Sequence, residues 1–177
     1  VIERLVRDSV RIKAAVVEGD SFHRYNRAEM KDAIKEHATK GKNLSHFGPD
    51  ANLFDKLEEL FRTYGETGGG QTRLYLHDES EAAPYKQQPG TFTPWTPIPE
   101  GSDLLFYEGL HGGAANGNVD VAKWVDLLVG VVPIVNLEWI QKIHRDTAQR
   151  GYTAEAVTDT ILRRMHDYVH YITPQFS

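Results

Sequence analysis

One acid, one imidazole and two guanidinium groups gather between residues 20 and 27, on Asp20, His23, Arg24 and Arg27. They follow a short apolar run at 14–17 that is typical of a buried strand. Ligands of parallel α/β sheets bind at the carboxyl ends of strands, so the cluster has a suitable place for chemistry. An aspartate can accept a proton from a hydroxyl while histidine and arginine hold an anion beside it. This favours action on a phosphorylated, hydroxylated small molecule; the alternative is a polar loop in which Asp20 only caps a helix.

A second acidic position, Glu108, comes directly after the apolar run at 104–107. A carboxylate at the end of a buried strand is the Walker-B arrangement, which orients Mg²⁺ or its water shell beside nucleotide phosphates. On spacing alone, the alternative is a solvated acid at the end of a strand. The Walker-B interpretation of Glu108 is strengthened by the presence of the first cluster.

A third group of charges lies on a predicted helix: Lys142, Arg145, Asp146 and Arg150. Residues three to five positions apart share one side of a helix, so several of these side chains can act together. One interpretation is a lid whose cations fold over transferring phosphates, with an acid among them. The other is an exposed helix with ordinary surface ion pairs.

The elements that would position these groups alternate between strands and helices, which indicates a mainly parallel, three-layer α/β sandwich. A glycine-rich stretch at 65–71 lacks the GxxxxGK[ST] pattern of a phosphate-binding loop and is expected to be a plain loop. Tyr75 and His77 would share one face of a strand, because strand side chains alternate. The predicted strands are 14–17, 73–77, 103–107, a central parallel strand at 127–135 and a final one at 168–172. The predicted helices are the tail of a helix at 2–10, helices at 28–39 and 53–64, a short helix or turn at 121–126, and a lid helix at 137–150. A last helix follows and carries one apolar stripe, made of Val157, Ile161, Met165 and Val169. A loop is expected at 43–52 and an irregular Pro-rich excursion at 79–101.

Composition bounds the class of protein. The 177 residues suffice for one domain with a real core, and the net charge of −5 argues against binding nucleic acid by phosphate neutralisation. The chain has no cysteine, no apolar run long enough to span a membrane and no visible signal peptide. We therefore expect a cytoplasmic protein without a membrane or nucleic-acid partner.

Several of these stretches carry a resemblance to one family. Residues 18–27, Glu-Gly-Asp-Ser-Phe-His-Arg-Tyr-Asn-Arg, followed by Ala-Glu-Met-Lys at 28–31, resemble the substrate-binding segment of bacterial-type phosphoribulokinase. Residues 145–151, Arg-Asp-x-x-x-Arg-Gly, resemble the lid helix of the P-loop phosphoribulokinase and uridine kinase group. Further similar stretches lie at 45–47, 64–68, 106–112, 132–142 and 163–166. The resemblance covers essentially the whole chain and implies a P-loop-kinase-like sheet.

The resemblance implies ATP-dependent phosphorylation of the C1 hydroxyl of D-ribulose 5-phosphate, giving ribulose 1,5-bisphosphate for the Calvin cycle, with Mg²⁺. Asp20 would be the catalytic base. The phosphates would be held and polarised by Lys142, Arg145 and Arg150, and Mg²⁺ would be served by Glu108 and Asp146; how base and metal roles divide between Asp20 and Asp146 is left open. The sugar phosphate would be bound by His23, Arg27, Lys31, Tyr75 and His77, with Arg24 a weaker candidate.

The resemblance also implies a homo-oligomer that responds to NADH. The family's P-loop should precede Asp20 by a helix and a strand and is not found in these 177 residues, so we expect a fold incomplete at both ends and inactive alone. Two alternatives stay open: another P-loop sugar or nucleoside kinase, such as a uridine kinase, and a non-catalytic module that binds sugar phosphate and regulates assembly.

Overall fold

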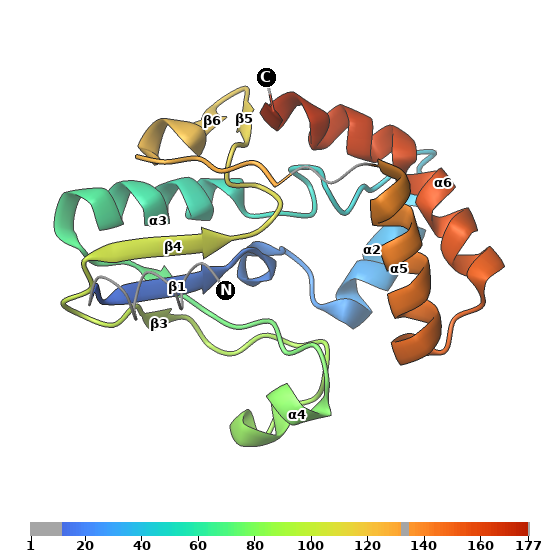
Figure 1. The fold of residues 1–177 in the computed structure, drawn as a ribbon, viewed down its shortest axis with the longest axis horizontal. Helices are drawn as coiled ribbons and strands as arrows, with labels where there is room; N and C mark the ends of the chain where they lie inside the picture. Colours follow the sequence, from blue (N-terminus) through green and yellow to red (C-terminus); the bar gives the residue numbers. More distant parts are fainter. Residues whose placement is uncertain (1–11, 132–134, 177) are drawn as a thin grey trace. The chain divides into compact units, whose positions relative to one another are not determined.

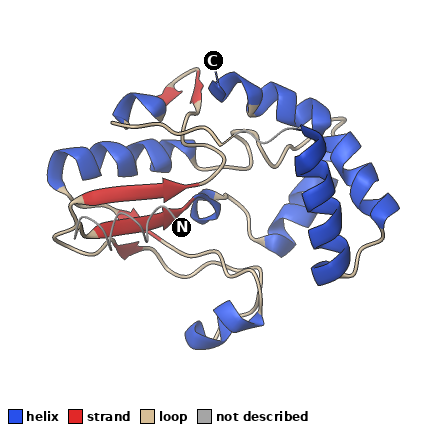
Figure 2. Ribbon diagram, viewed as in Figure 1, coloured by secondary structure: helices blue, strands red, loops and turns tan. Residues whose placement is uncertain are grey.

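The computed structural model describes residues 12–131 and 135–176, drawn as ribbons in Figures 1 and 2. The described residues fall into two compact units whose boundary lies between Asp126 and Leu127. The helix expected at 2–10 lies outside the described residues. A single domain over 1–177 stays a prediction.

The first unit is built around two parallel strands. Strand β1 (Ala14–Glu18) pairs with β4 (Leu104–Glu108) in a register that runs from Ala14↔Leu104 to Glu18↔Glu108, and the two lie side by side in Figure 1. Both predicted strands are confirmed. Because the two strands are parallel and in register, both end at the same edge of the sheet. Asp20 follows β1 at this edge, in the 3-10 helix η1 (Gly19–Phe22).

Helix α3 (Phe54–Thr67) covers this pair and supplies much of its core. Leu57, Leu60 and Phe61 are buried on one face, where they join Ala15 and Val17 of β1, as their helical spacing predicts. The helix continues three residues beyond its predicted end at 64, so the expected loop at 65–71 begins late, at Gly68.

The glycine-rich stretch is a helix-to-strand connection. Gly68 has a φ of 70° and ends α3, and β2 (Gln71–Thr72) follows. A phosphate-binding loop connects a strand to a helix, the reverse order. The structure therefore confirms that this stretch is no P-loop.

Residues 71–97 form a long antiparallel ribbon. Strand β2 pairs with β3 (Thr96–Pro97), Tyr75 bridges to Phe92, and the far end carries the one-turn helix α4 (Glu79–Ala82) and η2 (Ala83–Tyr85). The strand predicted at 73–77 is not a regular strand: Leu74 and Leu76 exchange backbone hydrogen bonds with residues 90–93, but the ladder is reduced to the isolated bridge at Tyr75. The opposing side is Pro-rich, and a proline has no amide hydrogen to donate to a ladder.

Helix α2 (Arg27–Thr39) follows η1 and matches its prediction closely. It starts at a capping box, in which the Asn26 side chain accepts from the Ala28 and Glu29 amides and the Glu29 side chain accepts from the Asn26 amide. Met30 and Ala33 bury its inner face, and residues 43–52 form the predicted loop. The unit ends with β5 (Ala115–Asn116), β6 (Val119–Asp120) and η3 (Ala122–Trp124), the last confirming the turn expected at 121–126.

The second unit contains α5 (Val135–Arg150), α6 (Ala154–Tyr171) and η4 (Thr173–Phe176). Helices α5 and α6 pack together, and the Thr153 side chain caps α6 by accepting from the Ala156 amide. Val157 and Ile161 are buried on the predicted stripe, but Val169 is 55% exposed. The strand predicted at 168–172 was wrong, because α6 continues through Tyr171.

The central strand predicted at 127–135 was also wrong where it can be seen. Residues 127–131 form no helix or strand and expose Leu127 and Val131, α5 already includes Val135, and 132–134 lie outside the described residues. An apolar run becomes a central strand only by hydrogen bonding to neighbouring strands. Among the described residues no strand pairs with it.

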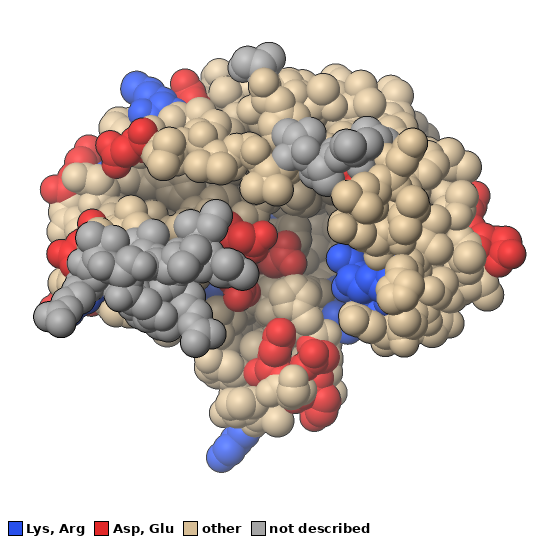
Figure 3. All heavy atoms as spheres, in the orientation of Figure 1, with Lys and Arg blue, Asp and Glu red and all other residues tan. Residues whose placement is uncertain are grey.

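Charged side chains form several separate groups on the face drawn in Figure 3. On the face drawn in Figure 3, Asp and Glu side chains gather in several small groups, and Lys and Arg side chains form separate ones. No helix among the described residues has both the length and the apolar character needed to cross a membrane.

Two glycines allow the ends of β1 and β4 to approach closely, which yields a stability prediction. A Cβ on Gly19 would lie 2.7 Å from the Tyr107 hydroxyl and 2.8 Å from the Gly109 Cα. We expect Gly19→Ala to lower the free energy of unfolding by about 1–3 kcal/mol, because overpacked backbone must shift. Urea unfolding followed by circular dichroism measures it.

The matched control is Gly65→Ala within α3, where a Cβ would meet no atom within 4 Å. This change should raise stability by about 0.5–1 kcal/mol, because alanine loses less backbone entropy in a helix. Equal effects of the two substitutions would contradict the close approach.

Candidate active site

The Asp20 carboxylate accepts hydrogen bonds from two imidazoles. His23 Nε2 lies 3.0 Å from its Oδ1 and His77 Nε2 lies 2.9 Å from its Oδ2. His23 comes from the end of η1, three residues on, whereas His77 comes from the ribbon, fifty-seven residues away. The sequence placed the two histidines near the same substrate; the structure shows both on the predicted base.

The partners of His23 determine its protonation. Its Nδ1 lies 2.8 Å from the Asn52 Oδ1, while the Asn52 Nδ2 donates to the His46 and Gly48 carbonyls. The amide orientation is thereby fixed, and an oxygen that carries no hydrogen faces Nδ1. The Asp20 carboxylate faces Nε2 in the same way. Both contacts can be hydrogen bonds at once only when both ring nitrogens carry a hydrogen, so the arrangement favours the imidazolium form of His23.

His77 is held in the same state by two carboxylates. Its Nδ1 lies 3.0 Å from the Glu81 Oε2, which also accepts from the His77 amide at 2.7 Å. Since ionised carboxylates only accept, both contacts are hydrogen bonds only in the imidazolium form of His77, which this arrangement favours. Asp20 therefore lies between two imidazolium ions.

The pKa values shift accordingly. The hydrogen bond from His23 lowers the pKa of Asp20 well below its usual range, against the opposing effect of burial, and His77 adds to the lowering. Burial would lower the pKa of His23, but the hydrogen bond and charge of Asp20 outweigh it and raise that pKa. Burial likewise opposes the raised pKa of His77, which Asp20 and Glu81 produce together.

Arg73 joins the ribbon to the loop that carries Asp20. Its Nε donates to the Ser21 carbonyl at 2.8 Å and its Nη2 to the His23 carbonyl at 2.6 Å. The guanidinium lies over the Phe92 ring at 3.6 Å and near the Trp95 ring at 4.7 Å. Arg73 fixes the backbone on both sides of Phe22 and so the direction of the His23 side chain.

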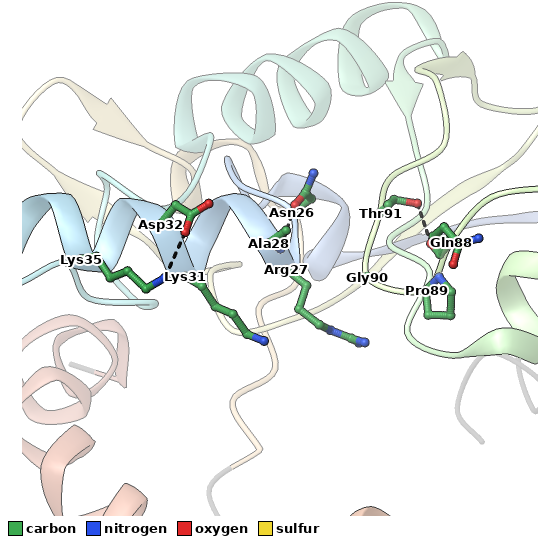
Figure 4. A pocket seen from close by; sticks show the side chains of 10 residues that line it. All are labelled: Asn26, Arg27, Ala28, Lys31, Asp32, Lys35, Gln88, Pro89, Gly90 and Thr91. Carbon is green, nitrogen blue, oxygen red and sulfur yellow. Dashed lines mark hydrogen bonds and ion pairs between the residues drawn. The ribbon is translucent and has the colours of Figure 1, made fainter.

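A cavity of about 400 Å³ opens beside the start of α2. Arg27 and Lys31 project into it from one side of the helix, and the ribbon residues 88–91 face them, as Figure 4 shows. Lys35 also lines it, one turn further on, with its ammonium 3.3 Å from Asp32. Cations on one face of a helix opposite backbone are suited to an anionic group.

Arg27 connects this cavity to the Asp20 cluster. Its Nη2 donates to the His77 carbonyl at 2.8 Å, and its amide donates to the Gly90 carbonyl at 2.9 Å. The Tyr75 ring makes edge contacts with both histidines, at centroid distances of 6.2 Å from His23 and 4.9 Å from His77. The structure thus brings together Asp20, His23, Arg27, Tyr75 and His77, while Lys31 lines the adjoining cavity.

Arg24 points elsewhere. Its Nε donates to the Asp50 carbonyl at 3.1 Å and its Nη2 to the Asn52 carbonyl at 3.2 Å. These bonds hold the 43–52 loop, a structural use of the side chain.

Glu108 lies at the predicted sheet edge, exposed and directly opposite Glu18 in the strand register. Among the described residues, no group of three His, Cys, Asp or Glu side chains converges as a metal site. Mg²⁺ commonly takes only one or two carboxylates, with water and substrate phosphates completing its shell. An exposed carboxylate at this edge therefore fits Mg²⁺.

The charged cluster of the second unit converges on Asp146, which is 4% exposed. Lys142 Nζ lies 2.6 Å from its Oδ2, and Arg145 Nε and Arg150 Nη1 lie 3.0 and 3.1 Å from its Oδ1. Burial opposes ionisation, but the bonds from Lys142 and Arg145 dominate and lower the pKa of Asp146. Both oxygens are in use, so binding Mg²⁺ would require Asp146 to give up a cation.

Sequence reasoning missed Glu81, Asn52, Arg73 and Lys35. Lys35 could have been found, because it continues the i, i+4 series of Arg27 and Lys31. Asn52 and Arg73 act through partners 29 and about 50 residues away, and no local pattern marks them.

The raised histidine pKa values predict how stability depends on pH. Folded-state pKa values above the unfolded 6.5 give stability that is complete below pH 6.5 and lost as pH rises through the folded values. Because the groups are partly exposed, we expect a fall of about 1 kcal/mol at most between pH 6 and 9.

Asp20→Asn should remove most of this fall in urea unfolding, because Asp20 is the largest of the influences that raise the two histidine pKa values. Asp50→Asn, at an exposed position of the 43–52 loop, is the control that should keep it. An unchanged pH dependence in Asp20→Asn would contradict the two-imidazolium arrangement.

Comparisons with known proteins identify curated relatives of this chain. A phosphoribulokinase of Nitrobacter vulgaris is 61% identical over 167 residues, which are 94% of this chain and 58% of that protein. The chromosomal phosphoribulokinase of Cupriavidus necator is 63% identical over 167 residues, 94% of this chain and 57% of that protein. The chain thus spans less than two thirds of the length of these curated relatives.

A solved structure, the phosphoribulokinase from Rhodobacter spheroides, superimposes with a TM-score of 0.84 at 52% identity, over 99% of this chain and 61% of that one. The predicted α/β, P-loop-kinase-like fold is confirmed by this match. The model of the Phosphoribulokinase / Uridine kinase family matches residues 1–177. The chain therefore belongs to the Phosphoribulokinase / Uridine kinase family.

Proposed function

We propose that the whole protein transfers the γ-phosphoryl group of ATP to the C1 hydroxyl of D-ribulose 5-phosphate, and that this chain carries the acceptor site. The observation that carries the proposal is the Asp20 carboxylate between His23 and His77, joined through Arg27 to a cationic cavity. Curated relatives named phosphoribulokinase support it.

The 5-phosphate of the acceptor would bind in the cavity. Arg27 and Lys31 offer charge-assisted hydrogen bonds there, and Lys35 adds positive charge. His23, Tyr75 and His77 would contact the sugar between that phosphate and Asp20. An anchored phosphate places the hydroxyl at the other end of the sugar against the base, which lowers the entropic part of the barrier.

Asp20 would accept the hydroxyl proton late in the reaction. A carboxylate with a lowered pKa cannot deprotonate an alcohol in advance, so the proton moves as the bond to phosphorus forms. The lowered pKa keeps Asp20 ionised throughout the neutral range and ready to accept. The two imidazolium ions fix the direction of its oxygens.

The donor phosphates would be held by Lys142, Arg145 and Arg150, which exchange Asp146 for phosphate oxygens. Such a guanidinium contributes about 10³–10⁵ in rate when it stabilises a transferring phosphoryl group. Glu108 is the first candidate to hold Mg²⁺, and Asp146 the second. When bound, Mg²⁺ supplies neutralisation of the phosphate charge.

A homo-oligomer and an NADH effector remain predictions from the family resemblance, and a cytoplasmic location remains a prediction from composition. So does the expectation that these 177 residues alone are inactive, because their sequence contains no P-loop.

The catalytic role of Asp20 can be measured by ADP release from the whole protein with ATP, Mg²⁺ and D-ribulose 5-phosphate. Asp20→Asn should lower kcat by about 10²–10⁴, the usual contribution of a general base, and change the acceptor KM little. Uridine as acceptor should give no turnover. Turnover with uridine in place of the sugar phosphate would favour a nucleoside kinase, and none with either acceptor would favour a binding module.

The anion-binding role of the cavity predicts a different kinetic change. Lys31→Met should raise the acceptor KM about 10- to 100-fold, the equivalent of one lost charge-assisted hydrogen bond, while kcat falls less. Lys42→Met, on the loop after α2, is the control and should leave both constants unchanged. An unchanged KM in Lys31→Met would place the acceptor phosphate elsewhere.

A further inference from the structure

We propose that Glu81 is a positioning residue for this site: its carboxylate holds the imidazole of His77 on Asp20. The kinetic part of this inference rests on the proposed function. The structural part stands on the contacts of the ribbon tip alone.

One oxygen of Glu81 fixes both the backbone and the ring of His77. Oε2 accepts from the His77 amide at 2.7 Å and from its Nδ1 at 3.0 Å. With the backbone and one ring nitrogen held, the ring has one direction, and that direction places Nε2 2.9 Å from the Asp20 Oδ2.

The position of Glu81 is itself fixed by the fold. Asp78 caps α4, and its Oδ1 accepts from the Glu81 amide at 3.1 Å and from the Ser80 hydroxyl at 2.6 Å. Ala82, the next residue, is fully buried and anchors the turn. A one-turn helix at the end of the ribbon therefore has a clear task, which is to present Glu81 to His77.

The charge of Glu81 matters as well as its shape. A neutral imidazole has one N–H and could donate to Glu81 or to Asp20, but not to both. On the other side of Asp20, the neutral amide of Asn52 faces His23. The two histidines therefore differ in their second partner, which is a charged carboxylate for His77 and a neutral amide for His23.

Charged and titratable groups face His77 from every element around it. From η1 comes Asp20, with His23 behind it; from α2 comes Arg27, which donates to the His77 carbonyl; the ribbon itself contributes Tyr75, Asp78 and Glu81. Glu81 is the carboxylate that binds Nδ1, so its removal leaves only Asp20 to favour protonation of this ring by a direct hydrogen bond.

The test compares Glu81→Gln with Glu79→Gln in the whole protein. Glutamine at 81 can still accept from the His77 amide, but it lacks the charge. Glu79 is an exposed acid of the same one-turn helix and serves as the matched control. NMR titration of His77 should show a lower pKa in Glu81→Gln and the wild-type value in Glu79→Gln.

Kinase activity provides the second readout. The kcat of Glu81→Gln should approach the wild-type value at pH 6, where His77 is still protonated, and fall about tenfold at pH 8, the usual order for a lost orienting partner. Glu81→Asp, which restores the charge, should recover much of the loss, and circular dichroism should show all variants folded.

The outcomes separate the two proposals. An unchanged His77 pKa in Glu81→Gln overturns the role of Glu81, whatever the activity. If the His77 pKa is lowered in Glu81→Gln but the loss of kcat is the same at every pH, the positioning role of Glu81 in the reaction is overturned. A wild-type protein without kinase activity overturns the proposed function, and the titration of His77 then decides the Glu81 contact by itself.

Discussion

The site depends on one carboxylate that two imidazolium ions share. Ion pairs as exposed as these contribute only about 0–1 kcal/mol to stability, so their importance lies in direction and not in energy. Each oxygen of Asp20 has one donor, at 3.0 and 2.9 Å, and the carboxylate is thereby oriented before any acceptor arrives. Pre-orientation of this kind removes part of the cost of aligning a base with a hydroxyl.

The rest of the first unit can be understood as the means of assembling this contact. Parallel pairing of β1 with β4 brings both strand ends to one edge, and the close approach of Gly19 to Gly109 lets the chain turn into η1 there. The ribbon then returns His77 to the same place, with Arg73 binding it to the Ser21 and His23 carbonyls. A strand, a turn and a distant ribbon each contribute one necessary part.

The second unit contains a similar arrangement, a carboxylate with cationic side chains around it, but the number of cations differs. There the carboxylate of Asp146 is nearly buried and gathers three cations, whereas Asp20 is half exposed and gathers two. A carboxylate that collects cations keeps them close together and oriented, and phosphate oxygens can later take its place as acceptor. Orientation of like charges by a central opposite charge is thus common to both sites.

The sequence predicted what depends on neighbouring residues. The strand before Asp20 and the helix after it follow from local pattern, and the structure agrees with both. What failed depended on distant partners: residues 127–131 have no strand beside them in the described part of the chain, and 168–171 continue a helix.

The contacts of the ribbon could not be predicted from the sequence, because they also depend on distant partners. Glu81 is four residues from His77 in sequence, but nothing in that spacing shows that the ring between them reaches Asp20. Only the return of the ribbon to the sheet edge makes Glu81 a partner of the site. Family resemblance named His77 as a substrate ligand, and the structure adds its contact with the Asp20 carboxylate.

The most direct measurement is the ¹⁵N chemical shift of the ring nitrogens of His23 and His77 at pH 7, obtained from long-range ¹H–¹⁵N spectra and assigned by His23→Gln and His77→Gln. The account predicts that all four nitrogens resonate as protonated, because each faces an oxygen that carries no hydrogen. An unprotonated nitrogen in either ring would contradict a carboxylate held between two imidazolium ions, and with it the orientation of Asp20 proposed here.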